Sequence, residues 1–333
     1  MRAVRRAAKA FLHRAGLFRL RAARRLNGTL TVLMYHRVLP AADPRRLASF
    51  DEYVLGDQAF AASLDVVEAV HRPVALGDVL AALEGRSRLP PRAALLTFDD
   101  GWLDTLEVAA PELARRGLPS VVFVPPAVFD DDEPFWQERL LLGVRTGRIG
   151  HDTLRELARA AGLAVRASAP APLLSLIAKL TDLPREERAG MLRGVAGVRE
   201  AGQPFLRPGD LPRLRALGVD IGAHGLTHEA LTTVPDPMAE LVRSRAILSE
   251  LAGVPVEAMS FPHGRYDAPI AAQAFAAGYR AVFTSDAVIN RLPSNPAAGA
   301  LFGRLGVYPG AARRGELAAD LTGRPIEDVR TTA

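Results

Sequence analysis

The sequence predicts an α/β protein in which parallel strands form a barrel, interrupted by one helical insertion. Two observations support the barrel: short apolar runs alternate with helical patterns, and about seven such units occur along the 333 residues. This alternation is typical of a parallel sheet covered by helices, and the number of units favours a barrel over an open sheet. The insertion is indicated by a long stretch in which the alternation stops.

The predicted strands are short, nearly continuous apolar runs, as expected for strands that are buried on both faces. They cover residues 31–38, 93–98, 120–124, 219–223, 258–261, 279–284 and 305–308. Helical patterns cover residues 57–70, 102–116, 208–217, 237–252 and 268–277. The helix at 237–252 has clear boundaries, because Asp236 and Pro237 form a start signal and Gly253 follows its last residue.

The stretch from about 127 to 207 contains no convincing strand, whereas 151–161 and 171–194 have helical patterns. We interpret it as a helical insertion after the strand that ends at Val124. Barrel active sites form from the loops at the carboxyl ends of the strands, so we expect the insertion to overhang the site and shape substrate access. A lateral decoration without such a role is the alternative.

The composition is that of a globular protein, with 49% apolar and 24% charged residues. The chain has no cysteine, which excludes disulfides and thiolate zinc sites and leaves His, Asp and Glu as metal ligands. No run of about 18 apolar residues occurs, so no membrane-spanning helix is predicted.

Residues 1–27 form a basic segment ahead of the barrel, which we expect to cover 28–333. The segment carries nine Arg or Lys and no acid; subtracting nine from the net charge of +5 leaves about −4 for the remainder. Its apolar residues recur at helical spacing, so it predicts a basic amphipathic helix that binds an anionic membrane surface. A solvated helix packed on its own domain and a partner-docking arm are the alternatives. Nucleic acid is not an expected partner, because no recognition motif accompanies the tail, and no oligomeric state is indicated.

The segment 96–101 is the most informative part of the chain: an apolar strand runs into Asp99, Asp100 and a glycine turn. A second segment places His224 and His228 four residues apart at the end of another apolar run. Two histidines and a carboxylate suit a borderline metal such as Zn²⁺, and a second carboxylate supplies a base. The two segments together predict a metal-dependent hydrolase.

These motifs resemble the first two motifs of the polysaccharide deacetylase family (NodB homology domain, carbohydrate esterase family 4). The chain reads Thr-Phe-Asp-Asp-Gly at 97–101 and His-Gly-Leu-Thr-His at 224–228. The opening at 32–38 resembles the exopolysaccharide branch, which includes poly-β-1,6-N-acetylglucosamine deacetylases; 260–267 and 277–281 are supportive matches. The resemblance implies a deformed (β/α)₇ barrel and metal-assisted removal of acetyl groups from sugars.

Carried onto this chain, the resemblance makes Asp99 the general base and Asp100, His224 and His228 the ligands of one divalent metal, with Zn²⁺ as the default. A backbone N–H near His263 in the third motif is expected to stabilise the oxyanion. In the same motif, Tyr266 is expected to contact substrate.

Two departures from the family pattern affect the expected roles. The arginine that usually precedes the proline of the third motif, and holds the catalytic Asp, is replaced by Ser260; Arg265 could approach from the other side. The histidine of the last motif is absent from the matching segment 302–307. His36, near the end of the first strand, corresponds to a histidine thought to replace that acid in the exopolysaccharide branch, and His263 is the alternative. Trp102 and Trp136 could stack on sugars or serve packing.

The leading hypothesis is a hydrolase of non-peptide C–N bonds that deacetylates N-acetylated sugars of a polysaccharide or glycan precursor. A deacylase of a non-sugar amide is one alternative. A catalytically weakened glycan-binding or membrane-docking protein on the same fold is another, because the usual arginine and histidine are missing. We expect a cytoplasmic protein that associates with the inner face of the membrane, since no clear export signal is present.

Overall fold

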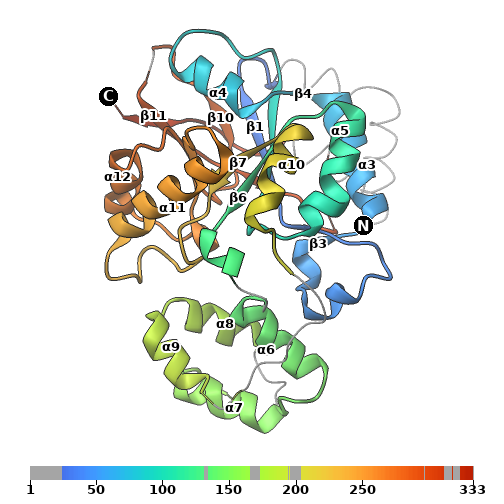
Figure 1. Ribbon diagram of the computed structural model, residues 1–333, viewed down its shortest axis with the longest axis vertical. Coiled ribbons are helices and arrows are strands. Elements are labelled where there is room, and N and C mark those ends of the chain that lie inside the picture. Colours follow the sequence, from blue (N-terminus) through green and yellow to red (C-terminus); the bar gives the residue numbers. More distant parts are fainter. Residues whose placement is uncertain are drawn as a thin grey trace.

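Seven parallel strands form a nearly closed, barrel-shaped sheet in the computed structural model (Figure 1). In order around the sheet they are β1 (Leu30–Tyr35), β5 (Ala93–Phe98), β6 (Ser120–Val124), β7 (Val219–Ala223), β8 (Ala258–Ser260), β9 (Ala281–Phe283) and β11 (Gly299–Phe302). A short strand, β12 (Leu305–Gly306), follows β11 and pairs in parallel with β1, which brings the two edges together. The predicted fold class, a deformed barrel of parallel strands, is confirmed.

The structure describes residues 25–130, 134–165, 173–193, 195, 204–295, 297–310, 317 and 323–332. The predicted basic amphipathic helix therefore lies outside the described residues, except at its end. There, Leu26 is fully buried in the main core and Arg25 donates a hydrogen bond of 2.6 Å to the carbonyl of Arg324. Arg25 and Leu26, which the sequence places in the basic segment, thus contact the barrel.

Short strands extend the sheet or pair beside it. They are β2 (Arg37–Val38), β3 (Val54–Leu55), β4 (Arg72–Pro73), β10 (Ile289–Arg291), β13 (Ile326–Asp328) and β14 (Arg330–Thr332). The strand expected at 305–308 is only the two-residue β12, and β11 was not predicted. Gly299 and Ala300 give β11 little strand propensity. An added Cβ at Gly299 would meet the ring of Phe275 at 2.7 Å, so close packing explains the small residue.

Helices cover the outside of the barrel, as the alternation predicted. They are α3 (Asp57–Val70), π-helix η3 (Thr105–Ala109), α5 (Ala110–Arg116), α10 (Leu211–Ala216), α11 (Pro237–Ala252) and α12 (Ala268–Ala276). Short 3₁₀ helices are η1 (Pro44–Ala48), η2 (Asp51–Tyr53), η4 (Pro126–Asp130), η5 (Pro208–Asp210) and η6 (Pro262–Gly264). The unpredicted helix α4 (Leu76–Leu83) packs with the cluster inside the barrel, at the end opposite the insertion (Figure 1).

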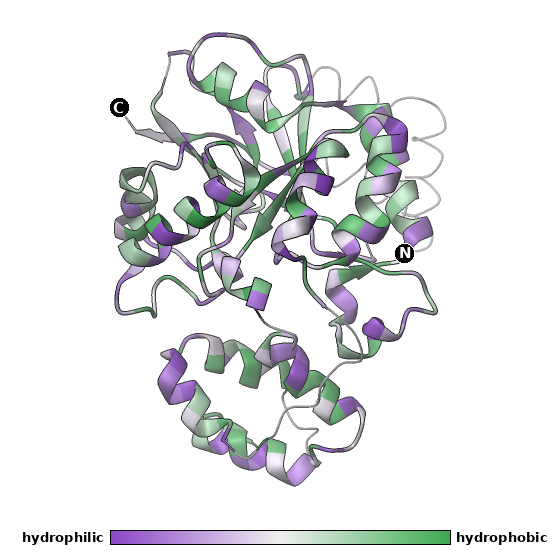
Figure 2. Ribbon diagram, viewed as in Figure 1, coloured by the Kyte–Doolittle hydropathy of each residue, from purple (hydrophilic) through white to green (hydrophobic). Residues whose placement is uncertain are grey.

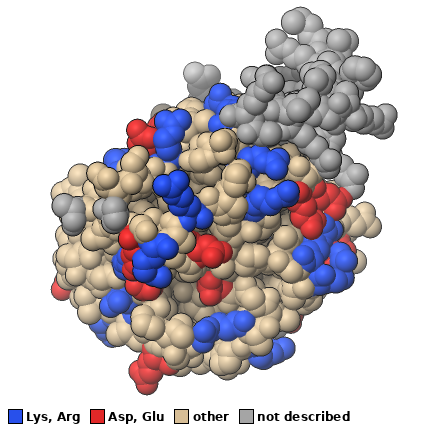
Figure 3. All heavy atoms as spheres, turned by 90° about the horizontal axis from the view of Figure 1, so that it is seen from above, with Lys and Arg blue, Asp and Glu red and all other residues tan. Residues whose placement is uncertain are grey.

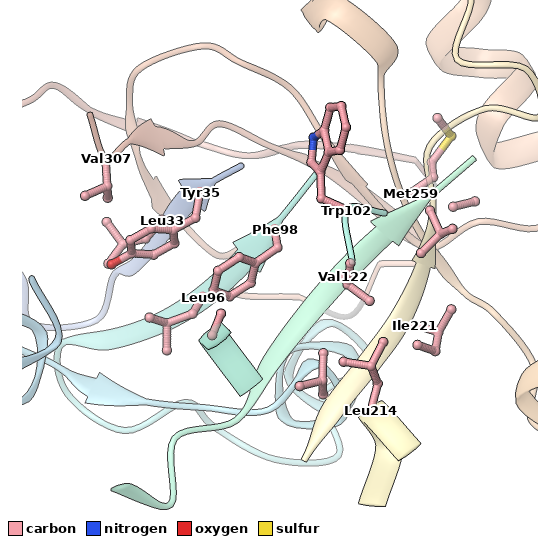
Figure 4. Packing of buried hydrophobic residues seen from close by; sticks show 14 of the residues in the cluster. Leu33, Tyr35, Leu96, Phe98, Trp102, Val122, Leu214, Ile221, Met259 and Val307 are labelled. Carbon is pink, nitrogen blue, oxygen red and sulfur yellow. The ribbon is translucent and has the colours of Figure 1, made fainter. Parts of the chain in front are cut away.

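Alternate residues of each strand belong to different cores. In β5, Leu96 and Phe98 pack outward against the helices, whereas Ala93 and Leu95 pack inside the barrel. Figure 4 shows the outward layer, with the Leu96 and Phe98 side chains on the same side of their strand. Because successive side chains of a strand point to opposite faces, the residue after Phe98 belongs to the inside of the barrel.

Between β6 and α10, the described part of the chain forms four α-helices that lie together beyond the carboxyl end of β6 (Figure 1). They are α6 (Trp136–Arg145), α7 (His151–Ala160), α8 (Leu173–Thr181) and α9 (Arg185–Met191). This group, called the insertion below, has a small apolar core of its own that includes Leu140, Leu154 and Leu176. Its helix α6 was not predicted.

Hydropathy follows this layering, since the strands are mainly apolar and the helices carry polar residues on their outer sides (Figure 2). Figure 3 shows the end of the molecule opposite the insertion, where Lys and Arg side chains are interspersed with Asp and Glu. Within the described ranges, no helix has the length and apolar character needed to cross a membrane.

Candidate metal centre and active-site cavity

The carboxyl ends of β5 and β7 bring Asp99, Asp100 and His224 together inside the barrel mouth. Asp99 has the inward parity of Leu95, and Asp100 then turns back because its φ is 78° and that of Gly101 is 71°. Aspartate tolerates the left-handed region better than most residues. Two features require glycine at position 101: its φ lies in the left-handed region, and an added Cβ would lie 2.9 Å from Cγ1 of Val124.

Asp100, His224 and His228 present one ligand atom each within 4.8 Å of one another. Oδ1 of Asp100 lies 3.3 Å from Nε2 of His224 and 3.1 Å from Nε2 of His228. Ligands at about 2.0–2.1 Å from a tetrahedral metal are separated by about 3.3 Å, so this spacing fits a divalent cation. Nδ1 of His224 lies 3.0 Å from the carbonyl of Ser260, which orients Nε2 with its lone pair towards the site.

The protonation states of these side chains suit metal binding. Burial would raise the pKa of Asp100, but the close contacts with His224 and His228 hold it well below its usual value. Burial lowers the pKa of His228, which favours the neutral imidazole. An ionised carboxylate and neutral imidazoles are the ligating forms of these groups.

Asp99 is held by an arginine that the motifs did not reveal. Nη1 and Nη2 of Arg304 donate hydrogen bonds of 2.7 and 2.8 Å to the two carboxylate oxygens of Asp99. Nε of Arg304 donates to the carbonyl of Thr284 at 2.9 Å, which fixes the guanidinium. Burial would raise the pKa of Asp99, but Arg304 keeps it below its usual value, so the carboxylate is ionised at neutral pH.

Arg304 supplies the contact that the family's third motif usually makes from the position of Ser260. Here the Ser260 hydroxyl donates a long hydrogen bond of 3.3 Å to Asp99. Arg265, the alternative considered from the sequence, instead pairs with Asp182 of the insertion at 3.1 Å. Arg304 lies two residues after Phe302 and shares its inward parity. The sequence alone does not assign this parity, because Gly299 and Ala300 give β11 little strand propensity.

His36 lies between β1 and β2 and lines the same cavity as the carboxylates. Its ring is half-buried, 4.8 Å from the ring of Tyr53, and it interacts electrostatically with Asp99 and Asp100. His36 lies four residues after Val32, whose side chain packs inside the barrel, so the His36 side chain has the same inward parity. The structure therefore brings His36 to the cavity that holds the predicted base and ligands.

His263 also lines the cavity, with its ring 4.5 Å from that of His228. Its Nε2 lies 3.0 Å from the carbonyl of His228, and its φ of 57° is in the left-handed region. Tyr266 does not reach this site: its hydroxyl donates to Asp286 at 2.6 Å and its ring stacks on Phe261 at 4.9 Å. Tyr266 is not among the residues that line the cavity, and its contact with substrate stays a prediction.

The predicted residues open into a cavity of about 470 Å³. The barrel contributes two partly exposed aromatic rings to its wall, Tyr53 (43% exposed) and Tyr308 (38%). Helix α8 of the insertion contributes Leu174 and Ile177. The insertion thus forms part of the wall of the cavity in which the site lies. A pocket of this size, with a few convergent polar groups, is typical of a small-ligand site.

Comparison with known proteins gives a family match and a shared fold. Residues 186–282, which include His224 and His228, match the family model described as polysaccharide deacetylase. No curated protein matches the sequence at a significant level. The family resemblance inferred from the motifs is confirmed by this match.

Solved structures with the same fold cover most of the chain. A deacetylase from Streptococcus pyogenes, PplD in complex with acetate, has a TM-score of 0.57 at 16% identity and covers 89% of this chain and 99% of its own. IcaB from Ammonifex degensii has a TM-score of 0.56 at 21% identity and covers 89% of this chain and 98% of its own. A de-N-acetylase from Aggregatibacter actinomycetemcomitans has a TM-score of 0.51 at 16% identity, covering 83% of this chain and 94% of its own.

Proposed function

We propose, from the resemblance to the polysaccharide deacetylase family and from the site, that this protein is a metal-dependent hydrolase of N-acetyl groups on sugars. The observation that carries the proposal is the pairing of two adjacent carboxylates with different partners. Asp100 faces two histidines, whereas Asp99 is held by Arg304. One carboxylate is thereby suited to bind a cation and the other to accept a proton.

Asp100, His224 and His228 would hold the divalent cation, with Zn²⁺ as the expected metal because the ligands are imidazole and carboxylate. A cation at this site would polarise the acetyl carbonyl and lower the pKa of the attacking water. In the step that we propose, Asp99 takes a proton from that water as its oxygen bonds to the acetyl carbon. Arg304 keeps the carboxylate ionised and oriented for this transfer.

Collapse of the tetrahedral species breaks the C–N bond, and the leaving nitrogen needs a proton. We assign this proton to His36, because its imidazole lines the same cavity and histidine is the side chain that most often serves as a general acid or base. The products are acetate and the free amine of the sugar. The N–H of His263 forms no hydrogen bond with any described residue, which supports its expected role as an oxyanion donor.

The geometry weakens the case for a merely binding protein. That alternative rested on the missing arginine and histidine of the family motifs. Arg304 supplies the arginine contact, and His36 places an imidazole in the cavity. A binding protein has no physical need for a carboxylate whose two oxygens are both held by an arginine, beside a cluster of three possible metal ligands.

The test is acetate release from partially acetylated glucosamine oligomers by the full chain. We expect release with Zn²⁺, loss of release after chelation, and recovery when Zn²⁺ is restored. Asp100→Asn is the matched control, because it changes one ligand atom while keeping the size of the side chain. Binding of the oligomers without any acetate release by the Zn²⁺-loaded protein would contradict the proposal and favour the glycan-binding alternative.

A further inference from the structure

Both ends of the insertion return to the loop that carries the metal-binding carboxylate. At its far end, the N–H of Leu103 donates to the carbonyl of Pro204 at 3.0 Å, and the N–H of Leu206 donates to the carbonyl of Gly101 at 2.9 Å. Phe205 thus pairs with Trp102 in an antiparallel bridge. The near end reaches the same place, because Phe135 lies directly before α6.

Trp102 is enclosed by these two ends of the insertion. Its ring stacks on Phe205 with the centroids 4.6 Å apart, and Phe135 packs edge-on at 5.4 Å. The guanidinium of Arg37 lies 4.0 Å from the Trp102 centroid. The side chain is only 1% exposed, so no sugar can stack on it. Figure 4 shows Trp102 beyond the strand that carries Leu96 and Phe98, at the carboxyl end of the barrel.

The single donor of Trp102 is directed at the metal-binding carboxylate. Its Nε1 donates a hydrogen bond of 2.9 Å to Oδ2 of Asp100. The other oxygen, Oδ1, is the one that faces Nε2 of His224 and Nε2 of His228. Oδ2 of Asp100 therefore accepts from the indole N–H, whereas Oδ1 faces the two histidines.

The near end of the insertion also contacts a second ligand. The Phe135 ring stacks on the His228 ring, with centroids 4.0 Å apart and planes at 27°. The residue after His228, Glu229, pairs with Arg188 of α9, and both side chains are largely buried. The insertion is thus packed against the loop of His228 as well as the loop of Asp100.

We propose that Trp102, clamped between Phe135 and Phe205, is a positioning residue that fixes Asp100 so that one carboxylate oxygen faces the metal. The insertion is then a structural part of the metal site, in addition to forming the cavity wall. This inference rests on the proposed metal site. Removing a group that hydrogen-bonds to a metal ligand and orients it typically lowers the metal affinity 10–100-fold.

The experiment compares Zn²⁺ affinity of the full chain with that of Trp102→Phe, by competition with a chelator of known affinity. The substitution keeps an aromatic ring between Phe135 and Phe205 but removes the donor to Asp100. We expect Zn²⁺ binding to weaken by about 10–100-fold. We also expect the visible absorption spectrum of the Co²⁺-loaded variant to change, because the freed oxygen alters the coordination of Co²⁺. Trp136→Phe is the matched control, since Trp136 packs against Arg188 and does not contact a ligand.

Phe205→Leu is a second variant, which keeps the indole donor but removes its stacking partner. It should weaken Zn²⁺ binding in the same direction. Thermal unfolding of each metal-free variant reports whether the fold is retained, and the affinity of Phe205→Leu decides the question if Trp102→Phe does not fold. Equal Zn²⁺ affinity and equal Co²⁺ spectra in wild type and variants would overturn the inference alone. Failure of the wild type to bind Zn²⁺ or Co²⁺ would overturn the proposed function itself.

Discussion

Arg304 and Asp99 lie 205 positions apart in the sequence and meet through two hydrogen bonds of 2.7 and 2.8 Å. Their side chains are 1% and 4% exposed. A paired contact of this kind fixes the direction of a carboxylate as well as its charge. Asp99 therefore cannot turn towards the metal site without losing Arg304, and this keeps it separate in role from Asp100.

The two neighbouring carboxylates should respond differently to the same substitution. Asp99→Asn is expected to abolish turnover while metal content stays near that of the wild type, because Asp99 is bound by Arg304 rather than by the ligand cluster. Asp100→Asn is expected to lose metal, because Oδ1 of Asp100 is one of the three clustered atoms that we propose to bind the cation. Metal analysis and acetate release on both variants check this. Loss of metal from Asp99→Asn with retention in Asp100→Asn would mean that the roles are reversed.

Arg304→Gln should affect both stability and the pH dependence of activity. Removing one partner of a buried ion pair costs about 3–5 kcal/mol of stability, which urea unfolding can measure. A misplaced base should lower turnover by on the order of 10²-fold. Because Arg304 lowers the pKa of Asp99, its loss should raise that pKa and move the acid limb of the activity profile to higher pH.

The control for Arg304 is Arg115→Gln, because Arg115 is 65% exposed on α5 and pairs with Glu112 of the same helix. We expect its stability to change by no more than about 0.5 kcal/mol and its pH profile to match the wild type. An unchanged acid limb in Arg304→Gln, with turnover near normal, would show that Arg304 does not govern Asp99.

His36→Ala should lower turnover by roughly 10²–10⁴-fold, the usual contribution of general acid–base catalysis. Metal content should remain intact, since His36 is not one of the three clustered ligands. His263→Ala is the comparison, because His263 lines the same cavity. If His36→Ala keeps near-normal turnover and His263→Ala loses it, the acid is His263.

His71 should make the protein less stable in mild acid. It is fully buried, its Nδ1 lies 3.3 Å from the carbonyl of Arg92, and no partner for its Nε2 is present in the described part of the chain. Burial lowers its pKa from the ordinary 6.5 to about 4. Between these pH values His71 is protonated in the unfolded chain but neutral in the folded chain. The contribution of neutral His71 to the free energy of unfolding is therefore fully present above pH 6.5 and falls as the pH decreases to about 4.

The loss attributable to His71 should reach about 2–3 kcal/mol at pH 4.5 relative to pH 7. Urea unfolding of wild type and His71→Leu at both values measures it, since the variant cannot take up the proton. The wild type should lose more stability than His71→Leu over this interval. Parallel losses in the two proteins would assign the acid sensitivity to other groups.

Removal of residues 1–24 should leave the barrel folded and active on soluble substrate, but weaken binding to anionic vesicles. The cut precedes Arg25 because Leu26 is part of the core. Basic residues near an anionic surface contribute about 1 kcal/mol each, and eight of them lie in the removed segment. Co-sedimentation with vesicles of mixed neutral and anionic lipid measures binding. Equal sedimentation of the full and shortened chains would remove the membrane hypothesis.

The sequence by itself determined many of the local elements and the three residues of the Asp100, His224 and His228 cluster. The strands at 93–98, 120–124 and 219–223 and the helices at 57–70 and 237–252 have the predicted bounds, because apolar periodicity and end signals are local properties. The cluster followed because its members stand at or just beyond the carboxyl ends of parallel strands, which share one end of a barrel.

Only the tertiary structure decided which residues support that cluster. Arg304 reaches Asp99 because β11 closes the barrel beside β9, and the short, glycine-started β11 carries no clear strand signal. Trp102 reaches Asp100 because both ends of the insertion pack around it. Such contacts depend on the register and closure of elements far apart in the chain, and no local pattern of residues encodes them.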